Sequence, residues 1–136
     1  MTDADDRPRM WLVRHGETEW ARLGKHTGRT DIPLTELGRA QAGAVARRLA
    51  AHSFEQVISS PLSRALDTAR LAGFGDRVRT DVDLLEWDYG RDEGRTTAEI
   101  GLDRPGWTIW TGGPEAGETI DEVAARVDRV IARARA

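Results

Sequence analysis

The stretch Met10-Trp11-Leu12-Val13-Arg14-His15-Gly16 decides the fold that we expect from this sequence. Its first four residues form an apolar run that is too short for a helix. A short run that is apolar on both faces is typical of a buried strand in a parallel sheet. We therefore predict a buried strand over residues 9–14 that ends with the side chains of Arg14 and His15.

Strands and helices alternate along the rest of the chain. A second short strand is predicted over residues 56–59, and alternating apolar positions predict a third, half-buried strand from Val78 to Leu84. Because parallel strands are joined by helical crossovers, the pattern predicts an α/β domain with helices packed against a parallel sheet. Three strands make a small sheet, so we expect a further strand-helix unit after Ala136.

Capping residues mark the predicted helices. Thr35 is expected to cap a helix that continues to about residue 52, with a buried side formed by Leu37, Ala40, Ala44, Val45 and Leu49. Ser60-Pro61 has the form of an N-cap followed by proline and predicts a helix to about residue 72. A capping-box spacing at residues 119–122 precedes an apolar stripe that continues to the chain end.

Two polar segments separate these elements. The loop over residues 17–33 is long enough to be functional and is expected to include a short helical turn. The region over residues 88–117 is rich in Gly, Pro and charge, and a short helix is expected near residues 96–101. Within it, Trp107 and Trp110 are interpreted first as core residues and second as part of a substrate lid.

The composition limits what the protein does. At 136 residues the chain suits one domain, placed over residues 9–136 after a solvated, disordered tail at residues 1–8. The net charge of −3 is unlike the basic surfaces that bind nucleic acid or anionic membranes, so neither is an expected partner. Without cysteine, disulfides, thiolate metal sites and cysteine nucleophiles are excluded. No apolar run reaches membrane-spanning length and no secretory signal opens the chain, so a cytoplasmic location is expected; no feature indicates an oligomeric state.

Ionisable side chains follow the predicted strands at their carboxyl ends, where ligands bind in open α/β sheets. Arg14 and His15 follow the first strand and Glu86 follows the third. Arg64 stands in the first turn of the helix after the second strand, near the positive end of the helix dipole. We expect these four side chains to converge. No metal-ligand spacing accompanies them, so neither a metal nor another cofactor is expected.

This set of groups suits phosphoryl transfer through the histidine. Arginine forks match the oxygens of a phosphate group and remain charged. A neutral His15, held at one ring nitrogen, can attack phosphorus with the other nitrogen. Glu86 can then protonate the leaving oxygen and later assist water in cleaving the phosphohistidine. By contrast, His26 is interpreted as loop surface and His52 as exposed near a helix end.

Several motifs stand in order along the chain: Leu12-Val13-Arg14-His15-Gly16-Glu17-Thr18, Thr27-Gly28-Arg29-Thr30-Asp31, Pro33-Leu34-Thr35-Glu36-Leu37-Gly38, Ser59-Ser60-Pro61-Leu62-Ser63-Arg64-Ala65, Glu86-Trp87-Asp88-Tyr89-Gly90 and Gly117-Glu118-Thr119. Together they resemble the histidine phosphatase superfamily, also called the phosphoglycerate mutase-like family. The resemblance implies a three-layer sandwich around a parallel sheet. It also implies that His15 is phosphorylated, that Arg14 and Arg64 clamp the phosphoryl oxygens and that Glu86 donates the proton.

The resemblance also bears on the substrate. It implies contacts to a small phosphorylated substrate from the backbone of Thr27 and Gly28, and a place for Tyr89 beside it. Mutases of the family carry a lysine where this chain has Thr97, and an arginine pair that the stretch at residues 103–105 lacks. Weaker retention of the phosphorylated intermediate favours hydrolysis over mutase-type transfer. The sequence is most similar to sugar-bisphosphate phosphatases of the sedoheptulose-bisphosphatase type, so a small sugar phosphate or bisphosphate is expected.

One feature of the family has no counterpart here. A second histidine, in a His-Gly pair after a later strand, has no matching residue before Ala136. The sequence is therefore expected to be either part of a longer protein or a shortened chain that lacks its final strand-helix units. Loss of one such donor costs on the order of a hundredfold to a thousandfold in turnover. A noncatalytic domain that binds a phosphorylated ligand stays open as an alternative to the phosphatase and the mutase.

Overall fold

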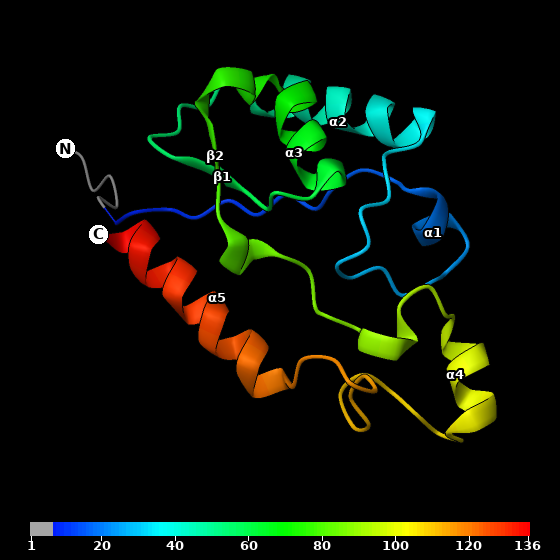
Figure 1. Cartoon of the computed structure of the whole chain (residues 1–136). Coiled ribbons are helices and arrows are strands. Elements are labelled where there is room, and N and C mark those ends of the chain that lie inside the picture. Colours follow the sequence, from blue (N-terminus) through cyan, green and yellow to red (C-terminus); the bar gives the residue numbers. More distant parts are fainter. Residues whose placement is uncertain (1–6) are drawn as a thin grey trace.

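A two-stranded parallel sheet lies at the centre of the computed structural model, which describes residues 7–136. Strand β1 (Val57–Ser59) pairs with β2 (Val78–Thr80), residue for residue in order. Figure 1 shows α2 (Glu36–Leu49) and α3 (Ser63–Ala69) on one side of this sheet and α5 (Ile120–Arg135) on the other. The predicted α/β fold, with a parallel sheet between helical layers, is confirmed.

The remaining helical segments are short and lie in the connections. They are α1 (Glu19–Arg22), the π-helix η1 (Arg70–Phe74), the 3₁₀ helices η2 (Gly75–Arg77), η3 (Val82–Leu84) and η4 (Gly90–Asp92), and α4 (Thr97–Asp103). The helical turn expected in the first polar loop is α1, and the short helix expected in the second polar region is α4. Both predictions are confirmed.

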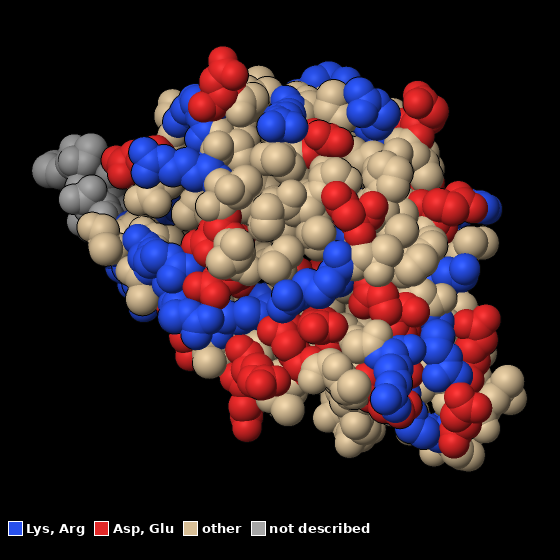
Figure 2. Space-filling view, viewed as in Figure 1, with Lys and Arg blue, Asp and Glu red and all other residues tan. Residues whose placement is uncertain are grey.

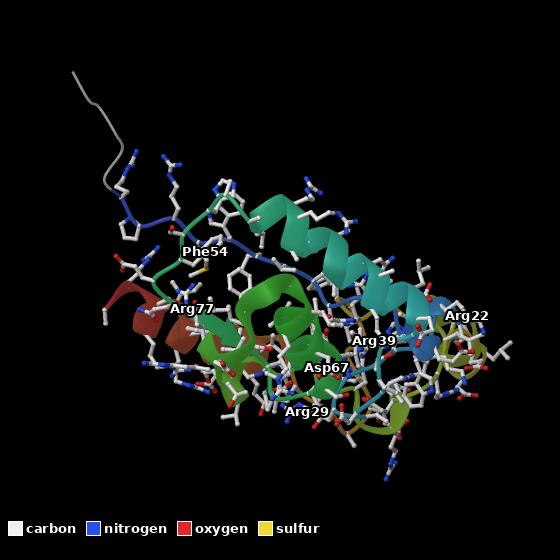
Figure 3. The ribbon with its side chains drawn as sticks, turned by 90° about the horizontal axis from the view of Figure 1, so that it is seen from above. Arg22, Arg29, Arg39, Phe54, Asp67 and Arg77 are labelled. Atoms are coloured by element: carbon white, nitrogen blue, oxygen red, sulfur yellow. The ribbon has the colours of Figure 1, made fainter. Side chains whose placement is uncertain are left out.

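Helix α2 begins as predicted. The Thr35 hydroxyl accepts a hydrogen bond from the Gly38 N–H at 3.1 Å, which caps the helix. In Figure 3 the helix is seen from above, and it packs against α3 and η1 with Ala42 fully buried. The predicted buried side is confirmed only in part, because Leu37 and Ala40 are exposed whereas Ala44, Val45 and Leu49 are half-buried. Gly38 and Ala42 are buried instead because close packing on this side requires small residues.

Helix α3 begins later than predicted. Its N-cap is Leu62, so the expectation of a cap at Ser60 was wrong by two residues. The Ser60 hydroxyl accepts from the Leu62 N–H at 3.2 Å and so stabilises a turn before the helix rather than its first turn. Arg64 nevertheless lies in the first turn, as predicted.

The third predicted strand is shorter than its apolar pattern indicated. It ends at Thr80, because the Asp81 carboxylate accepts from the Asp83 N–H at 2.9 Å and turns the chain. Residues Val82–Leu84 form η3 instead of continuing the ladder, and Val82 is exposed. The strand predicted from Val78 to Leu84 is therefore confirmed only over residues 78–80.

The predicted buried strand at residues 9–14 is not formed in the described chain. These residues have no strand partner, and Leu12 is 87% exposed. Trp11 packs on His52 and Phe54, with ring centroids 4.6 and 5.7 Å away. An extended run is buried only when strands pair with its edges and other elements cover its faces, and residues 7–136 do not supply both.

Residues 1–6 of the expected tail lie outside the described residues, and residues 7 and 8 are exposed. A strand-helix unit beyond residue 136 stays a prediction. Within residues 7–136 no helix has the length and apolar character needed to cross a membrane.

Helix α5 carries the predicted capping box, in which Thr119 and Glu122 each bond the other's backbone N–H. Of its apolar stripe, Val130 is buried, whereas Ile120 and Val127 are exposed. Ion pairs supplement the apolar contact, and Figure 2 shows basic and acidic side chains interleaved over one face of the molecule.

Arg126 is the buried link between α5 and the segment after β2. Its Nε donates to Glu118 Oε1 at 2.8 Å, and its Nη1 donates to the carbonyl oxygens of Asp83 and Leu85 at 2.9 and 2.6 Å. The side chain is only 8% exposed, so these partners replace its hydration. The backbone that leads into Glu86 is therefore fixed from the final helix.

We expect Arg126→Met to lower the free energy of unfolding by about 3 kcal/mol, because two carbonyl groups lose their buried donor and the half-buried Glu118 carboxylate loses one of its two arginine partners. Urea denaturation at neutral pH measures the change. Arg129→Met, which removes a cation from an exposed pair with Asp83 on the same helix, is the matched control and should have little effect. Equal effects of the two substitutions would contradict the role given to Arg126.

Candidate active site

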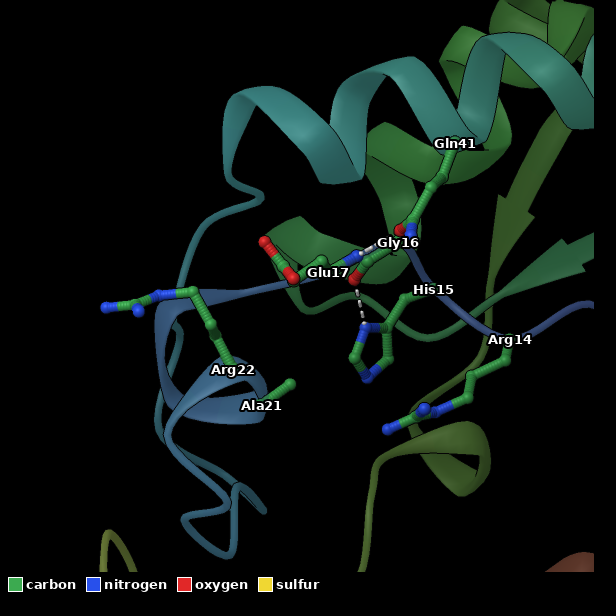
Figure 4. Close-up of a pocket in the computed structure, with 7 residues that line it drawn as sticks. All are labelled: Arg14, His15, Gly16, Glu17, Ala21, Arg22 and Gln41. Carbon is green, nitrogen blue, oxygen red and sulfur yellow. Dashed lines mark hydrogen bonds between the residues drawn. The ribbon is translucent and has the colours of Figure 1, made fainter.

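His15 has the form of a nucleophile held at one ring nitrogen. Its Nδ1 lies 2.7 Å from the carbonyl oxygen of Gly16. Because a carbonyl oxygen only accepts, this contact assigns the ring proton to Nδ1 and leaves a lone pair on Nε2. Figure 4 shows the half-buried ring extending from the chain beside the side chain of Arg14.

The surroundings of His15 favour its neutral form. Burial lowers the pKa of the imidazole, and the guanidinium groups of Arg64 and Arg14 lower it further. The hydrogen bond to Gly16 and the charge of Glu86 act in the opposite direction, but the net pKa lies below the ordinary value of 6.5. A neutral imidazole at pH 7 is the form that can attack phosphorus.

Two adjoining hollows meet at His15. The first, of about 240 Å³, is drawn in Figure 4 and is lined by Arg14, His15, Gly16, Glu17, Ala21, Arg22 and Gln41. The second, of about 260 Å³, is lined by Arg14, His15, Ala21, Gly24, Lys25, His26, Thr27, Glu86 and Tyr89. Each is slightly smaller than the usual range for ligand pockets, which fits a small ligand. The structure thus brings together five predicted site residues: Arg14, His15, Thr27, Glu86 and Tyr89.

Arg64 lines neither of these hollows. Its side chain was predicted to converge with those of Arg14, His15 and Glu86, but it binds main-chain carbonyl groups instead. Its side chain is buried, and its guanidinium donates to the carbonyl oxygens of Thr30 and Gly28 at 2.9 and 2.7 Å. It therefore fixes the loop after α1. Its charge still reaches the imidazole of His15, and no described residue accepts from its Nε.

Both backbone polar groups of Gly28 are engaged, because its carbonyl oxygen accepts from Arg64 and its N–H donates to Glu93. Its N–H donates to the Glu93 carboxylate at 2.7 Å, and the same carboxylate oxygen accepts from the Thr30 N–H at 2.9 Å. A Cβ on Gly28 would lie 2.1 Å from the carbonyl oxygen of Trp87, so this close approach requires glycine. Sequence reasoning missed Glu93, whose contact with residues 28–30 spans more than sixty residues. Only its position shortly after the Tyr89-Gly90 pair gave a signal.

Glu86 and Tyr89 reach the second hollow from the chain after η3. One Glu86 carboxylate oxygen accepts from the Trp87 N–H at 3.0 Å, while the side chain as a whole is exposed. Burial raises the pKa of Tyr89 to about 12, assisted by the charges of Glu86 and Glu93. The Tyr89 hydroxyl therefore keeps its proton and can donate a hydrogen bond to a ligand.

His26 differs from its interpretation as loop surface. Its half-buried ring lies in the wall of the second hollow, between Tyr89 and Trp107, with ring centroids 4.9 and 5.3 Å away. Its Nε2 lies 3.1 Å from the Thr97 hydroxyl, and burial lowers its pKa. Thr97 is the position at which mutases of the resembled family carry lysine. His52 is exposed after α2, as predicted.

The two tryptophans of the second polar region behave differently. Trp107 is buried and donates from Nε1 to the Gly113 carbonyl at 2.7 Å, which confirms its core interpretation. Trp110 is 71% exposed and only its edge meets Trp87, so its core interpretation was wrong. Within residues 7–136, no three or more His, Cys, Asp or Glu side chains gather in a way that could hold a metal ion.

The sequence of this chain matches a known protein family and several characterised relatives. A family model described as the histidine phosphatase superfamily (branch 1) matches residues 10–136. An acid phosphatase of Mycobacterium tuberculosis is 45% identical over 128 residues, which cover 93% of this chain and 63% of the relative. Sedoheptulose 1,7-bisphosphatase of Saccharomyces cerevisiae is 41% identical over 150 aligned residues, which cover 93% of this chain and 55% of the relative.

A solved structure agrees with the sequence relatives. The product of an open reading frame of Mycobacterium tuberculosis matches with a TM-score of 0.81 and 44% identity, over 88% of this chain and 62% of that chain. The phosphoglycerate mutase-like fold is therefore confirmed. The chain spans less than two thirds of the length of these three relatives.

We expect His15 to titrate below pH 6.5 when its imidazole is followed by NMR, because its folded-state pKa is depressed. As the pH falls below about 6.5, the unfolded chain binds this proton before the folded chain does, so the free energy of unfolding decreases. The loss continues until the folded-state pKa is passed. In His15→Gln this part of the pH dependence should vanish, as measured by urea denaturation at several pH values. A His15 pKa above 6.5 would contradict the assignment.

Proposed function

Because the chain belongs to the histidine phosphatase superfamily, we propose that it acts in the hydrolysis of phosphate monoesters with His15 as the phosphoryl acceptor. One observation carries this proposal. The Nδ1 of His15 is committed to the Gly16 carbonyl, so the free Nε2 stands beside Arg14 at the meeting point of two hollows. Relatives named as phosphatases support the same reaction class.

The reaction proceeds in two steps in this proposal. In the first, the Nε2 lone pair of His15 forms a bond to phosphorus while the ester P–O bond breaks, and Glu86 gives its proton to the leaving oxygen. In the second, water attacks phosphorus, Glu86 takes a proton from it, and the N–P bond breaks with its electrons returning to Nε2. The products are an alcohol and inorganic phosphate, and His15 is regenerated.

Positive charge for the transition state comes from arginine. The guanidinium of Arg14 lines both hollows, and that of Arg64 lies close enough to influence His15. Arg14 acts directly on the nonbridging oxygens, where a metal would act in other phosphatases, and the charge of the buried Arg64 adds to the positive potential around His15. We therefore propose a metal-independent hydrolase that needs no cofactor. Thr27 and the Tyr89 hydroxyl border the substrate, whereas the Gly28 N–H is already engaged by Glu93.

We propose a small sugar phosphate or bisphosphate as the substrate. The support is the sedoheptulose 1,7-bisphosphatase relative together with the polar and cationic wall that Lys25 and His26 contribute to the second hollow. The mutase alternative is less favoured, because Thr97 bonds His26 and supplies no cation to hold an intermediate. A cytoplasmic location belongs to the same proposal.

The phosphatase relatives are longer than this chain. The chain covers 55–63% of its curated phosphatase relatives, and no residue of the chain matches the second histidine of the family. We propose that the full catalytic domain includes a further strand-helix unit, which completes the phosphate pocket and covers the apolar residues at positions 10–13.

The test is phosphate release from a panel of sugar phosphates and bisphosphates, with chelator present throughout. We expect turnover in the unsubstituted chain, and its loss in His15→Ala without a change in the urea midpoint. His52→Ala, which removes an exposed histidine, is the matched control and should keep its activity. Rapid quenching at high pH should trap label from the substrate on His15 as an acid-labile phosphoramidate.

Three other outcomes have defined meanings. Release that persists in His15→Ala overturns the nucleophile assignment, and phosphate moved within the substrate instead of released identifies a mutase. If the folded chain binds inorganic phosphate without turnover, and adding the C-terminal unit of a relative does not restore turnover, the chain is a noncatalytic binding domain. If turnover is restored, the additional unit is part of the enzyme.

A further inference from the structure

We propose that Thr68 and Gln41 are positioning residues, which hold the Gly16 main chain so that its carbonyl keeps the proton of His15 on Nδ1. This inference rests on the proposed function of His15 as the phosphoryl acceptor. Neither side chain is assigned a part in binding the phosphoryl group. Both act through one glycine, whose N–H and C=O belong to successive peptide groups.

Thr68 fixes the first of these peptide groups. Its hydroxyl donates to the Arg64 carbonyl at 2.6 Å, and its oxygen accepts from the Gly16 N–H at 3.0 Å. Thr68 is 4% exposed, so water cannot easily replace it. Because its proton is committed to Arg64, the hydroxyl presents a lone pair to Gly16. The contact also ties the backbone of helix α3 to the residue that follows His15.

Gln41 fixes the second peptide group. Its Oε1 accepts from the Glu17 N–H at 2.8 Å, and this N–H shares a planar trans peptide with the Gly16 carbonyl. The orientation of the N–H therefore determines that of the carbonyl, which accepts from His15 on the opposite side. Figure 4 shows both hydrogen bonds, with Gln41 reaching down from α2 and the His15 ring lying beyond the peptide. Accepting from the N–H also polarises the peptide and strengthens its carbonyl as an acceptor.

Close packing against α2 restricts the position of the main chain at residues 16 and 17. A Cβ on Gly16 would lie 2.3 Å from the Gly38 carbonyl oxygen, and a Cβ on Gly38 would lie 2.1 Å from the Glu17 carbonyl oxygen. The Glu17 carbonyl in turn accepts from the Thr35 N–H at 2.9 Å. The main chain at residues 16–17 therefore lies flat against the helix, and only the peptide orientation is left for Thr68 and Gln41 to determine.

Loss of this orientation has a chemical consequence. If the Gly16 carbonyl turns away, Nδ1 loses its acceptor and the neutral ring shifts toward the tautomer with the proton on Nε2. That tautomer has no lone pair at the attacking nitrogen. Activity then falls although every group that touches the substrate is still present.

The experiment compares Gln41→Met with Gln56→Met, which removes the amide of the other, exposed glutamine. Thr68→Val removes the buried acceptor at nearly constant volume, and Thr68→Ser retains it. The tautomer of His15 is read by ¹⁵N NMR at pH 7.5, and kcat and KM are measured with p-nitrophenyl phosphate. Because Gln41 is exposed, its variant keeps the native urea midpoint even if Thr68→Val fails to fold.

We expect Gln41→Met to populate the Nε2–H tautomer and to lower kcat about tenfold with KM little changed. Thr68→Val should do the same, and Thr68→Ser and Gln56→Met should behave as the unsubstituted chain. A fully Nδ1–H His15 in folded Gln41→Met overturns the role of Gln41, and the same result in folded Thr68→Val overturns that of Thr68. If the unsubstituted chain has no turnover, the tautomer alone decides this inference, and the proposed function is decided separately by whether the C-terminal unit of a relative restores turnover.

Discussion

The buried guanidinium of Arg64 is the interaction on which the site depends. A charge taken out of water must be compensated by polar groups, and here the carbonyl oxygens of Thr30 and Gly28 provide that compensation. The loop after α1 is therefore bound to α3, far along the chain, and Glu93 holds the same loop through its N–H groups. With donors and acceptors of the loop both engaged, Thr27 is fixed at the wall of the hollow beside His15.

The charge of Arg64 also contributes to the protonation state of His15, the proposed nucleophile. Burial and the two arginine charges lower the pKa of His15, and an imidazole kept neutral is the attacking form. In the proposed mechanism, the arginine charges that attract a phosphoryl group therefore also disfavour protonation of His15. The negative charge of Glu86 acts in the opposite direction and raises the pKa of His15. A carboxylate in the place of either arginine would therefore favour the protonated imidazolium.

Local signals explain what the sequence predicted well. The caps of α2 and α5 involve residues three positions apart, so Thr35 and Thr119 are recognisable without the fold. The expectation that Arg14, His15 and Glu86 lie together agrees with the hollow that all three line, although the strands expected to end at these residues are absent or end earlier. The exposure of Leu12 and the contacts of Glu93 could not be predicted, because both depend on which distant segments meet. His26 was misread for the same reason, since its burial comes from Tyr89 and Trp107.

Arg126 repeats on α5 what Arg64 does on α3. Each is a buried arginine on a helix, and each donates to carbonyl oxygens of a loop that carries a site residue, with Arg126 binding the backbone just before Glu86. Sequence reasoning gave Arg64 a phosphate-binding role alone and gave Arg126 none, because arginine is usually a surface residue. Since carbonyl groups of irregular loops need donors that neighbouring strands do not supply, two helical arginines position the two loops whose residues line the second hollow together with His15.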